Sequence, residues 1–298
     1  MIASVTGQRA ALLRDAMRLR NALGLSDRDA RSEVELLLTR ALDITRARLI
    51  AHPELAAAAE QNSTYLRSLE RRLAGEPVAY ILGEREFYGH VFSVSRDVLI
   101  PRPETELLVD LALSRLEPDR PLKVLDLGTG SGAVAIAIAL HRPNVRIVAT
   151  DESPASLAVA NINAERLLGE ALQEQFQLVR SDWFEQVGGI RFDLIVSNPP
   201  YVAETDPHLD VGDIRFEPAR ALVSGRKGLD ALSKIIGEAP EHLKSGGWLL
   251  CEHGYDQAEA VRQLLEQAGF SQLLAEHDLA GATRVSGGRW LTSATGGA

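Results

Sequence analysis

Val124-Leu125-Asp126-Leu127 runs directly into Gly128-Thr129-Gly130-Ser131-Gly132, and an apolar segment follows from Ala133 to Leu140. The first four residues are typical of a buried strand, and the last segment is typical of a buried helix. Between them, glycines allow a sharp turn and let the backbone come close to a ligand. The free N–H groups at the start of a helix favour a polar or anionic group at the same place. This stretch therefore predicts a strand–loop–helix unit of a parallel α/β sheet, with a binding site at the loop.

The alternation of strand and helix continues along the chain. The expected strands are 146–150, 177–179, 192–197 and 247–252, and the expected helices are 104–116, 153–168, 229–243 and 256–268. Such alternation is typical of a doubly wound, mainly parallel sheet. Two further strands, 272–277 and 283–291, have no helix between them, so we expect an antiparallel edge. The predicted fold class is α/β, with a seven-stranded, Rossmann-like sheet.

Residues 1–75 lack a strand pattern and show helical periodicity instead. Apolar residues recur at near-helical spacing from Leu12 to Leu23, and Ser26 stands where it can cap the next helix. A later helix ends at Gly75. The alternating stretch 86–94 contains a glycine, as a short hairpin would. We therefore expect a helical domain at 1–85, a hairpin linker at 86–102 and a doubly wound domain at 103–298.

Acidic and aromatic residues stand where the next two strands end. Asp151 ends the second strand, 23 residues after Gly128, and a carboxylate there can accept hydrogen bonds from both ribose hydroxyls. Asp182 and Trp183 follow the third strand, where the carboxylate can accept from an adenine amino group and the indole offers a flat face for the base. The predicted cofactor-binding residues are Gly128, Thr129, Gly130, Ser131, Gly132, Asp151, Asp182 and Trp183.

These residues leave the identity of the nucleoside cofactor open. NAD and S-adenosylmethionine both fit a glycine loop with an acidic residue after the second strand, and such glycines also occur in plain tight turns. The loop spacing is G-x-G-x-G, without the G-x-G-x-x-G of the dinucleotide fingerprint. No arrangement for hydride transfer is evident. A second motif, which begins at Asn198, decides for S-adenosylmethionine.

That motif is Asn198-Pro199-Pro200-Tyr201, directly after the expected strand at 192–197. An amide or exocyclic amino nitrogen is a weak nucleophile and a very weak acid, so a general base is a poor way to activate it. The Asn198 side-chain carbonyl and the Pro199 backbone carbonyl can instead hold both N–H groups, on a turn that the prolines stiffen. Tyr201 can pack on the planar group. The alternative is a strand-ending turn whose asparagine caps a neighbour. We predict that Asn198, Pro199 and Tyr201 are catalytic and that Pro200 joins them in binding the substrate.

The composition is that of an ordinary globular protein, with 298 residues, 45% hydrophobic and 24% charged. No apolar run reaches the roughly 18 residues that span a bilayer, and the start of the chain has no export signal, so we expect the cytoplasm. The single Cys251 excludes an internal disulfide and a multi-cysteine metal site. The histidines form no pair at metal-ligand spacing, so no metal is expected.

The net charge of −9 is spread unevenly. Residues 1–85 carry 13 basic and 11 acidic residues, and the remainder carries 19 basic and 30 acidic residues. Tight non-specific binding to nucleic acid draws on a dense basic surface. The larger part of the chain offers no such surface by count, so direct nucleic-acid binding is not expected.

At these residues the chain resembles the release factor glutamine methyltransferases, the PrmC/HemK family, over nearly its whole length. The resemblance includes the helical N-terminal domain, the glycine loop, the Asn-Pro-Pro-Tyr turn, and the segments 75–80, 100–106 and 216–218. The Asn-Pro-Pro-Tyr motif alone is shared with DNA enzymes that methylate amino groups, whereas the combination is much more specific. The resemblance implies the fold of S-adenosylmethionine-dependent methyltransferases.

The resemblance also implies methylation of the glutamine side-chain amide nitrogen in the Gly-Gly-Gln motif of peptide chain release factors. It implies cofactor contacts by 128–132, Asp151, Trp183 and Asn198, with the glutamine bound by 198–201 and the N-terminal domain helping to bind the protein substrate. The roles of Arg102 and Glu217 stay open. The alternatives are a ribosomal-protein glutamine, an adenine amino group of nucleic acid, an NAD-dependent oxidoreductase, and a non-catalytic binding module. We expect a monomer that does not bind membranes.

Overall fold

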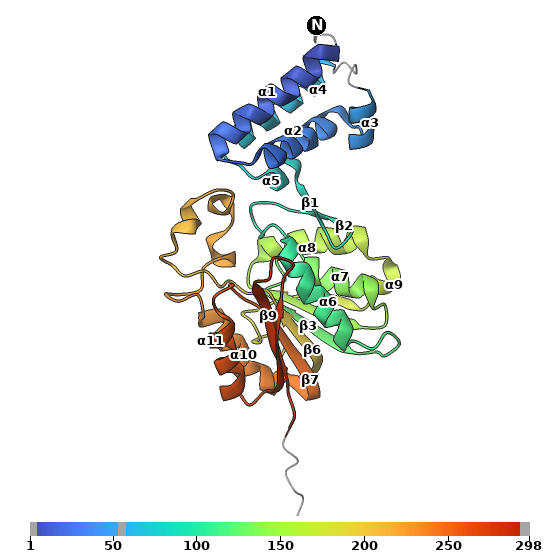
Figure 1. Cartoon of the computed structure of the whole chain (residues 1–298). Helices are drawn as coiled ribbons and strands as arrows, with labels where there is room; N and C mark the ends of the chain where they lie inside the picture. Colours follow the sequence, from blue (N-terminus) through green and yellow to red (C-terminus); the bar gives the residue numbers. More distant parts are fainter. Residues whose placement is uncertain (1–4, 53–57, 293–298) are drawn as a thin grey trace, which may run out of the picture. The chain divides into compact units, whose positions relative to one another are not determined.

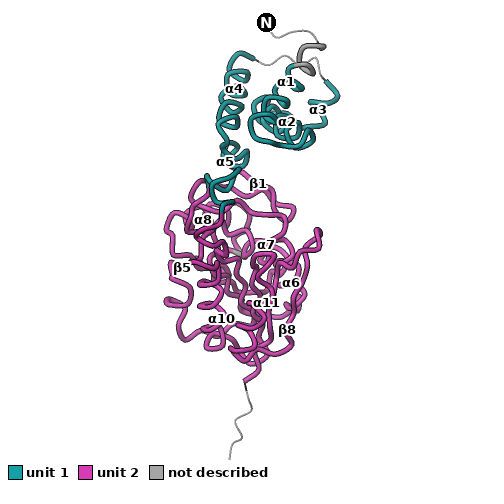
Figure 2. Tube along the Cα trace, turned by 60° about the vertical axis from the view of Figure 1, so that its left-hand side comes forward, with its two compact units in different colours: residues 1–83, 207–216 teal, residues 84–206, 217–298 magenta. Residues whose placement is uncertain are grey.

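A computed structural model of the chain describes residues 5–52 and 58–292. The chain forms two compact units, which we name the helical unit (residues 1–83 and 207–216) and the sheet unit (residues 84–206 and 217–298), shown in Figure 2. The segment 207–216 lies inside the domain expected at 103–298, yet it belongs to the helical unit. No local pattern marks such a segment, so the domain boundaries drawn from the sequence stay predictions.

The helical unit has its own apolar core. Its helices are α1 (Val5–Leu23), α2 (Asp27–Leu42), α3 (Arg46–Ala51), α4 (Ala59–Leu73) and α5 (Val78–Leu82). Ser26 caps α2 as predicted, since its hydroxyl oxygen accepts a hydrogen bond from the Asp29 N–H at 3.1 Å. Leu19, Val34 and Leu69 of α1, α2 and α4 are fully buried against one another. The predicted N-terminal helices are therefore confirmed.

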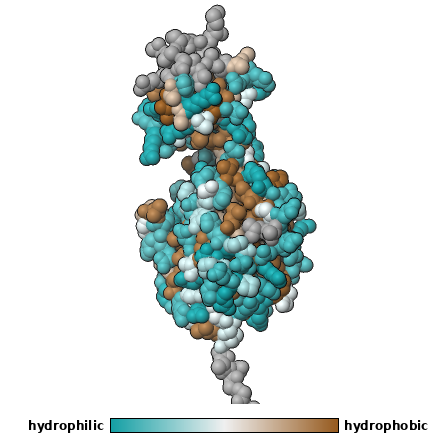
Figure 3. Space-filling view, turned by 90° about the vertical axis from the view of Figure 1, so that its right-hand side faces the viewer, coloured by the Kyte–Doolittle hydropathy of each residue, from teal (hydrophilic) through white to brown (hydrophobic). Residues whose placement is uncertain are grey.

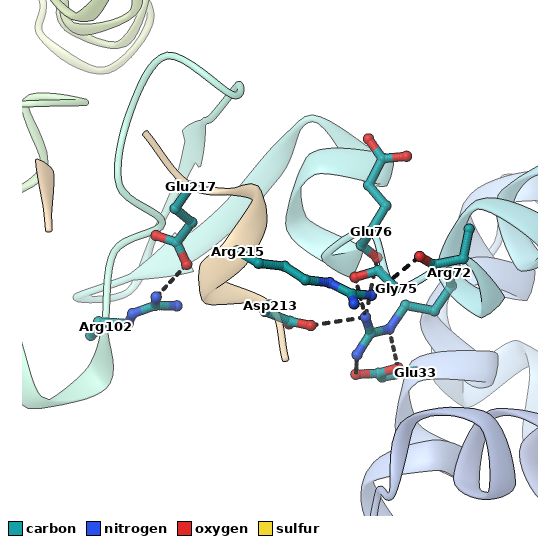
Figure 4. Close-up of polar contacts among 9 residues, drawn as sticks. Glu33, Arg72, Gly75, Glu76, Arg102, Asp213, Arg215 and Glu217 are labelled. Atoms are coloured by element: carbon teal, nitrogen blue, oxygen red, sulfur yellow. Dashed lines mark hydrogen bonds and ion pairs between the residues drawn. The ribbon is translucent and has the colours of Figure 1, made fainter. Parts of the chain in front are cut away.

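A buried arginine holds the segment 207–216 within the helical unit. The side chain of Arg72, on α4, is only 2% exposed. Its Nε donates to Glu33 at 2.7 Å and its Nη1 donates to Asp213 at 2.9 Å, as Figure 4 shows. A buried guanidinium is stable only when it is paired. Arg72 therefore fixes the position of Asp213, between the short 3-10 helices η2 (Pro207–Asp210) and η3 (Ile214–Phe216).

The sheet unit begins with an antiparallel hairpin of β1 (Glu84–Phe87) and β2 (His90–Ser93). Tyr88 and Gly89 form the turn with φ angles of 51° and 75°. Two successive positive φ angles are typical of the type I′ turn, whose twist matches that of the two strands. The predicted hairpin is therefore confirmed, and it starts two residues earlier than the sequence pattern indicated.

The main sheet has seven strands in the described part of the chain, in the order β5-β4-β3-β6-β7-β9-β8. They are β3 (Lys123–Leu127), β4 (Arg146–Asp151), β5 (Phe176–Arg180), β6 (Phe192–Ser197), β7 (Leu243–Glu252), β8 (Ser271–His277) and β9 (Thr283–Arg289). Pairing is parallel from β5 to β7, and β9 runs antiparallel to both β7 and β8. The prediction of a mainly parallel sheet with an antiparallel edge is confirmed.

The order of the strands reverses between β3 and β6. From β3 the chain first builds β4 and β5 on one side and then returns to place β6 and β7 on the other. In sheets of this kind, ligands bind outside the carboxyl ends of the strands at the point of reversal. The glycine loop follows β3, and the Asn-Pro-Pro-Tyr turn follows β6, so both predicted motifs lie at this point.

Helices cover both faces of the sheet. The helices of the sheet unit are η1 (Pro103–Thr105), α6 (Glu106–Arg115), α7 (Ala133–His141), α8 (Pro154–Leu167), α9 (Glu170–Gln173), η4 (Ala219–Ala221), α10 (Asp230–His242) and α11 (Ala258–Gln267). Val124 of β3 packs in one core with α6 and α7, whereas the next residue, Leu125, packs in a second core with α10 and α11. Figure 1 shows these helices on opposite sides of the sheet. Among the helices of residues 5–52 and 58–292, none has both the length and the apolar character needed to cross a bilayer.

Candidate active site

A cavity of about 480 Å³ lies in the sheet unit at the point where the strand order reverses. This volume is within the range of roughly 300–1,000 Å³ that is usual for small-molecule sites. The predicted site residues that line it are Gly128, Thr129, Gly130, Ser131, Asp151, Asp182, Trp183, Asn198 and Pro200. The other predicted site residues, Gly132, Pro199 and Tyr201, are not among its lining residues.

The first two glycines of the loop lie at the cavity and have different surroundings. Gly128 and Gly130 have φ angles of 71° and 55°, which glycine adopts without strain. A Cβ atom at Gly128 would lie 3.4 Å from the Trp183 ring, so glycine lets the indole come close to the loop. A Cβ atom at Gly130 would meet nothing within 4 Å. That open space at a cavity wall is where a ligand can approach the backbone.

Gly132 serves a different purpose. Its φ angle is 81°, and it directly precedes α7. A Cβ atom there would lie 2.9 Å from Cδ1 of Ile136 and 3.3 Å from Cβ of Ala160. The structure therefore gives the third glycine a packing role, between α7 and α8. Its predicted contact with the cofactor stays a prediction.

Asp151 joins the end of β4 to the glycine loop. One carboxylate oxygen accepts from the Gly130 N–H and the other from the Ser153 N–H, both at 2.9 Å. Burial raises the pKa of this carboxyl, while these two hydrogen bonds and the charge of Arg220 oppose the rise. A carboxylate offers about four lone pairs. Asp151 therefore keeps acceptor capacity for further hydroxyl groups in the cavity.

Asp126 is a second carboxyl at the cavity, and it is not among the site residues predicted from the sequence. It lies on β3, is 2% exposed, and accepts a hydrogen bond from the Thr129 hydroxyl at 2.6 Å. Burial raises its pKa to about 7, the Thr129 hydroxyl opposes this rise, and the negative charge of Asp151 adds to it. A charged residue in the apolar run Val-Leu-Asp-Leu was a signal that could have identified it.

The loop after β5 places an indole and a carboxylate at the wall of the cavity. Trp183 has a φ angle of 47°, and the Ser181 hydroxyl donates to its backbone carbonyl at 2.9 Å. The Asp182 carboxylate accepts from the Lys234 ammonium group at 2.9 Å, and Lys234 also lines the cavity. The ion pair is half-exposed, so the Asp182 carboxylate remains accessible to a ligand.

The Asn-Pro-Pro-Tyr turn presents an unusual atom. The Asn198 Nδ2 donates to the hydroxyl oxygen of Thr105 at 3.1 Å. The other end of the same amide, Oδ1, is buried and has no hydrogen-bond partner among the described residues. A buried acceptor without a partner costs about 1–3 kcal/mol, so such an atom is rare without a functional reason. Asn198 lines the cavity, and its free acceptor is the atom that the sequence analysis expected to hold an N–H group.

The backbone of this turn is fixed from behind. Val202 donates its N–H to the Leu222 carbonyl at 2.8 Å and accepts from the Ser224 N–H at 2.9 Å. The Gln257 side chain donates to the Tyr201 carbonyl at 3.0 Å. A turn held by these bonds can present Asn198 with little reorganisation.

Tyr201 points its hydroxyl to a buried carboxyl. The hydroxyl donates to Glu252 at 3.3 Å, and burial raises the pKa of Tyr201. Glu252, at the end of β7, is 1% exposed, and burial raises its pKa to about 7 against the opposing effect of the Thr105 and Tyr201 hydroxyls. The predicted packing of the Tyr201 ring on the substrate stays a prediction.

Arg102 also reaches the cavity, and Glu217 holds it. The Glu217 side chain is fully buried, accepts from the Ile100 N–H at 3.2 Å, and forms an ion pair with Arg102 (Figure 4). Arg102 lines the cavity, whereas Glu217 does not. The two residues whose roles the sequence left open are thus a cationic wall residue and its anchor.

Positively and negatively charged groups therefore surround the cavity. The lining cations are Arg102, Arg220 and Lys234, and the lining acidic residues are Asp97, Asp126, Asp151, Glu152, Asp182 and Asp230. The free lone pairs of Asp151 suit ribose hydroxyls, the indole of Trp183 suits a base, and the buried oxygen of Asn198 suits an N–H group. Such a set of groups fits a nucleoside that has a positively charged end, a negatively charged end and a reactive cation.

Two family models match the chain. The PrmC N-terminal domain matches residues 12–83, and the methyltransferase small domain matches residues 105–228. A solved structure of a methyltransferase from Pyrococcus furiosus aligns with 76% of this chain and 99% of its own, at a TM-score of 0.52 and 18% identity. At that identity the likeness shows the fold alone, which is that of the S-adenosylmethionine-dependent methyltransferases.

Curated relatives match over most of the chain. The release factor glutamine methyltransferase of Bordetella pertussis is 48% identical over 87% of this chain and 94% of its own length. That of Xylella fastidiosa is 47% identical over 89% of this chain and 94% of its own length. Because these relatives match over most of the chain and both family models match it, this chain belongs to the release factor glutamine methyltransferase family.

Proposed function

We propose that this protein transfers a methyl group from S-adenosylmethionine to the side-chain amide nitrogen of the glutamine in the Gly-Gly-Gln motif of release factors. The family to which the chain belongs supports this function. The observation that carries it is the buried Oδ1 of Asn198, which has no partner among the described residues and belongs to a residue that lines the cavity. The reaction takes place where release factors act, in the cytoplasm.

The residues around the glycine loop would hold the cofactor. Asp151 accepts the ribose hydroxyls with its remaining lone pairs, and Trp183 contacts the base. The open space at Gly130 admits part of the cofactor close to the backbone. Asp182 is the proposed acceptor for the adenine amino group, beside its partner Lys234. When bound, S-adenosylmethionine supplies a methyl group on a sulfonium centre, which is reactive enough to need no metal ion.

The turn after β6 would hold the glutamine. Its amide nitrogen is a weak nucleophile because the lone pair is delocalised into the carbonyl group. The Oδ1 of Asn198 and the backbone carbonyl of Pro199 accept its two N–H groups and so favour a pyramidal nitrogen. The backbone bonds of Val202 keep these acceptors in place before the substrate arrives. Orientation of this kind can supply several kcal/mol of the barrier reduction.

The helical unit is the proposed binding site for the body of the release factor. It exposes large apolar side chains, between 45% and 63% accessible, at Leu13, Met17, Leu36, Ile50 and Leu66. Apolar residues are visible among the hydrophilic ones on its surface in Figure 3. Exposed apolar side chains rimmed by charge are typical of protein-binding surfaces.

The test is a transfer assay with radiolabelled S-adenosylmethionine. The acceptors, each in a separate reaction, are a release factor, the same factor with alanine in place of the Gly-Gly-Gln glutamine, a mixture of ribosomal proteins, and DNA. We expect label in the unaltered release factor only. Label in the ribosomal proteins or in DNA, with none in the release factor, would replace the proposed substrate by one of the alternatives.

A further inference from the structure

We infer that Thr105 is a positioning residue, whose hydroxyl selects which end of the Asn198 amide faces the substrate. This inference rests on the proposed function, because it concerns the atom that holds the glutamine N–H. Thr105 is 4% exposed and lines the cavity from η1, 93 residues before Asn198 in the chain.

The side-chain amide of asparagine has two ends of nearly the same shape and opposite hydrogen-bonding character. With Nδ2 bound to Thr105 at 3.1 Å, Oδ1 is left as a free acceptor. In the reversed orientation Nδ2 would be the free end. It would place N–H groups against the N–H groups of the glutamine and leave them without an acceptor. The reaction therefore depends on the orientation in which Thr105 is the acceptor.

A hydroxyl can accept or donate, so something must direct the Thr105 proton away from Asn198. Ser197 of β6 pairs with Cys251 of β7, so Asn198, which follows β6, lies next to Glu252, the last residue of β7. The Oε2 of Glu252 is buried without a partner among the described residues, while the other oxygen accepts from Tyr201. Burial raises the pKa of Glu252, and the nearby Thr105 hydroxyl opposes that rise, as a group that favours the charged carboxylate does. The inference therefore directs the Thr105 proton toward this carboxylate, which leaves a lone pair of the Thr105 oxygen for the Nδ2 that donates to it.

Thr105 does not use its side chain to cap the helix that follows it. It stands at the position that precedes α6, where threonine commonly caps a helix, yet its side chain makes no capping hydrogen bond. Other charges near Glu252 are those of Arg284, which lowers the pKa of the carboxyl, and Glu104, which raises it. Within residues 5–52 and 58–292 no hydrogen bond joins either residue to Asn198, whereas Thr105 accepts one from its Nδ2.

The experiment compares Thr105→Val, which keeps the shape but loses the hydroxyl, with Thr105→Ser, which keeps the hydroxyl. Rates are measured at pH 8 with the full chain and a release factor, and S-adenosylhomocysteine affinity is measured by calorimetry. We expect kcat to fall at least about tenfold in Thr105→Val, the effect of losing one functional hydrogen bond. We expect Thr105→Ser to stay within about threefold of the wild type, and cofactor affinity to change less than about twofold in both.

A third comparison separates orientation from simple packing. Asn198→Asp has an oxygen at either end, so Thr105 has no orientation to select in that background. Adding Thr105→Val to it should lower kcat by less than about threefold, and the difference between the two backgrounds measures the coupling. Equal losses in both backgrounds, or a Thr105→Val rate close to that of the wild type, would overturn the inference. If Thr105→Val fails to fold, an inactive but folded Thr105→Ser would overturn it. A wild-type protein that leaves release factors unmethylated would instead defeat the proposed function.

Discussion

At the scale of single residues, the site depends on polar atoms that are buried before the substrate arrives. The Oδ1 of Asn198 has no partner in the described structure, and the carboxyls of Asp126 and Glu252 have pKa values raised to about 7. Each of these atoms costs stability in the free protein. Native proteins keep such atoms mostly where they serve binding or catalysis. The residue scale therefore offers the most direct tests of function.

Asn198→Ala removes the proposed acceptor for the glutamine N–H. We expect kcat to fall by about a hundredfold or more, the usual loss when one preorganised group at a reacting centre is removed. Binding of S-adenosylhomocysteine should survive with reduced affinity, because the glycine loop and Asp151 are unchanged. Steady-state kinetics and calorimetry measure the two effects. Retained turnover in this variant would contradict the acceptor role.

Glu252 makes a pH-dependent contribution to stability. Its pKa is about 7 in the folded protein against an ordinary value of 4.5. Between these two values the folded protein holds a proton that the unfolded chain has lost. The stability that this proton represents is complete below pH 4.5 and disappears as the pH rises through 7. Glu252→Gln removes this dependence.

From pH 5 to pH 8 we therefore expect the wild type to lose more free energy of unfolding than Glu252→Gln, by an amount on the order of 2 kcal/mol. Urea unfolding of both proteins at the two pH values gives this difference. Asp126, whose pKa is also raised, contributes equally to both proteins and cancels. Identical pH dependence in the two proteins would show that Glu252 titrates normally.

At the scale of elements, substitutions of Gly130 and Gly132 should have different effects, because these two loop glycines face different neighbours. An alanine at Gly132 would hold a left-handed conformation and place Cβ 2.9 Å from the end of the Ile136 side chain and 3.3 Å from Cβ of Ala160. The Ile136 side chain must then turn aside, and α8 must give way by a few tenths of an ångström. We expect a loss of about 2–4 kcal/mol of stability. An alanine at Gly130 meets no protein atom within 4 Å. Gly130→Ala should cost only about 1 kcal/mol of stability, and it should weaken the binding of S-adenosylhomocysteine at least about tenfold.

Urea unfolding and calorimetry on Gly130→Ala and Gly132→Ala measure the two effects, and each variant is the control for the other. The assignment of Gly132 to helix packing would be wrong if Gly132→Ala kept its stability and lost only its affinity for S-adenosylhomocysteine.

The position of the segment 207–216 depends on Arg72. Arg72→Met leaves Glu33 and Asp213 without their common partner. We expect a loss of about 2–4 kcal/mol, somewhat below the range for a fully buried pair because the Asp213 side chain is 40% exposed. The matched control is Arg20→Met, which breaks an ion pair with Asp27 between side chains that are 43% and 84% exposed and should cost less than about 1 kcal/mol. Hydrogen exchange in 207–216 locates the effect, and equal losses in the two variants would refute it.

Sequence patterns predicted the elements well where the pattern was local. The strand 192–197 agrees at both ends because its apolar residues are bounded by a charged residue and a proline turn. Strand β7 begins at Leu243, four residues before the predicted start, because Lys244 to Gly247 lacks the apolar run of a strand. The short helix α9 and the 3-10 helices were not predicted, since they are too short to show a period.

The site was predictable only in part for the same reason. Glycines and an Asn-Pro-Pro-Tyr turn are contiguous motifs, so the sequence analysis found them. The contact between Thr105 and Asn198 joins residues 93 apart, and that between Arg72 and Asp213 joins residues 141 apart. Such pairs meet only after the sheet and the helices have formed. No spacing in one sequence identifies them.

At the scale of the whole molecule, the two units divide the proposed work. Every residue that lines the cavity belongs to the sheet unit, and the core around Leu19, Val34 and Leu69 belongs to the helical unit alone. Separate cores allow each unit to keep its structure without the other. The helical unit should therefore contribute to the binding of the protein substrate and not to the chemistry of the cavity.

A chain restricted to residues 84–298 tests this division. We expect it to bind S-adenosylhomocysteine within about threefold of the full chain, because the lining residues from Phe87 to Lys234 are all retained. Its KM for an intact release factor should rise at least about tenfold, the loss of roughly 1.4 kcal/mol of docking energy. The kcat/KM for a short peptide that contains Gly-Gly-Gln should stay unchanged, since a peptide has no body to dock. Circular dichroism first establishes that the shortened chain is folded. If the folded chain then fails to bind S-adenosylhomocysteine, the cavity depends on the helical unit; if it methylates the intact factor as well as the full chain does, the helical unit is not the docking site.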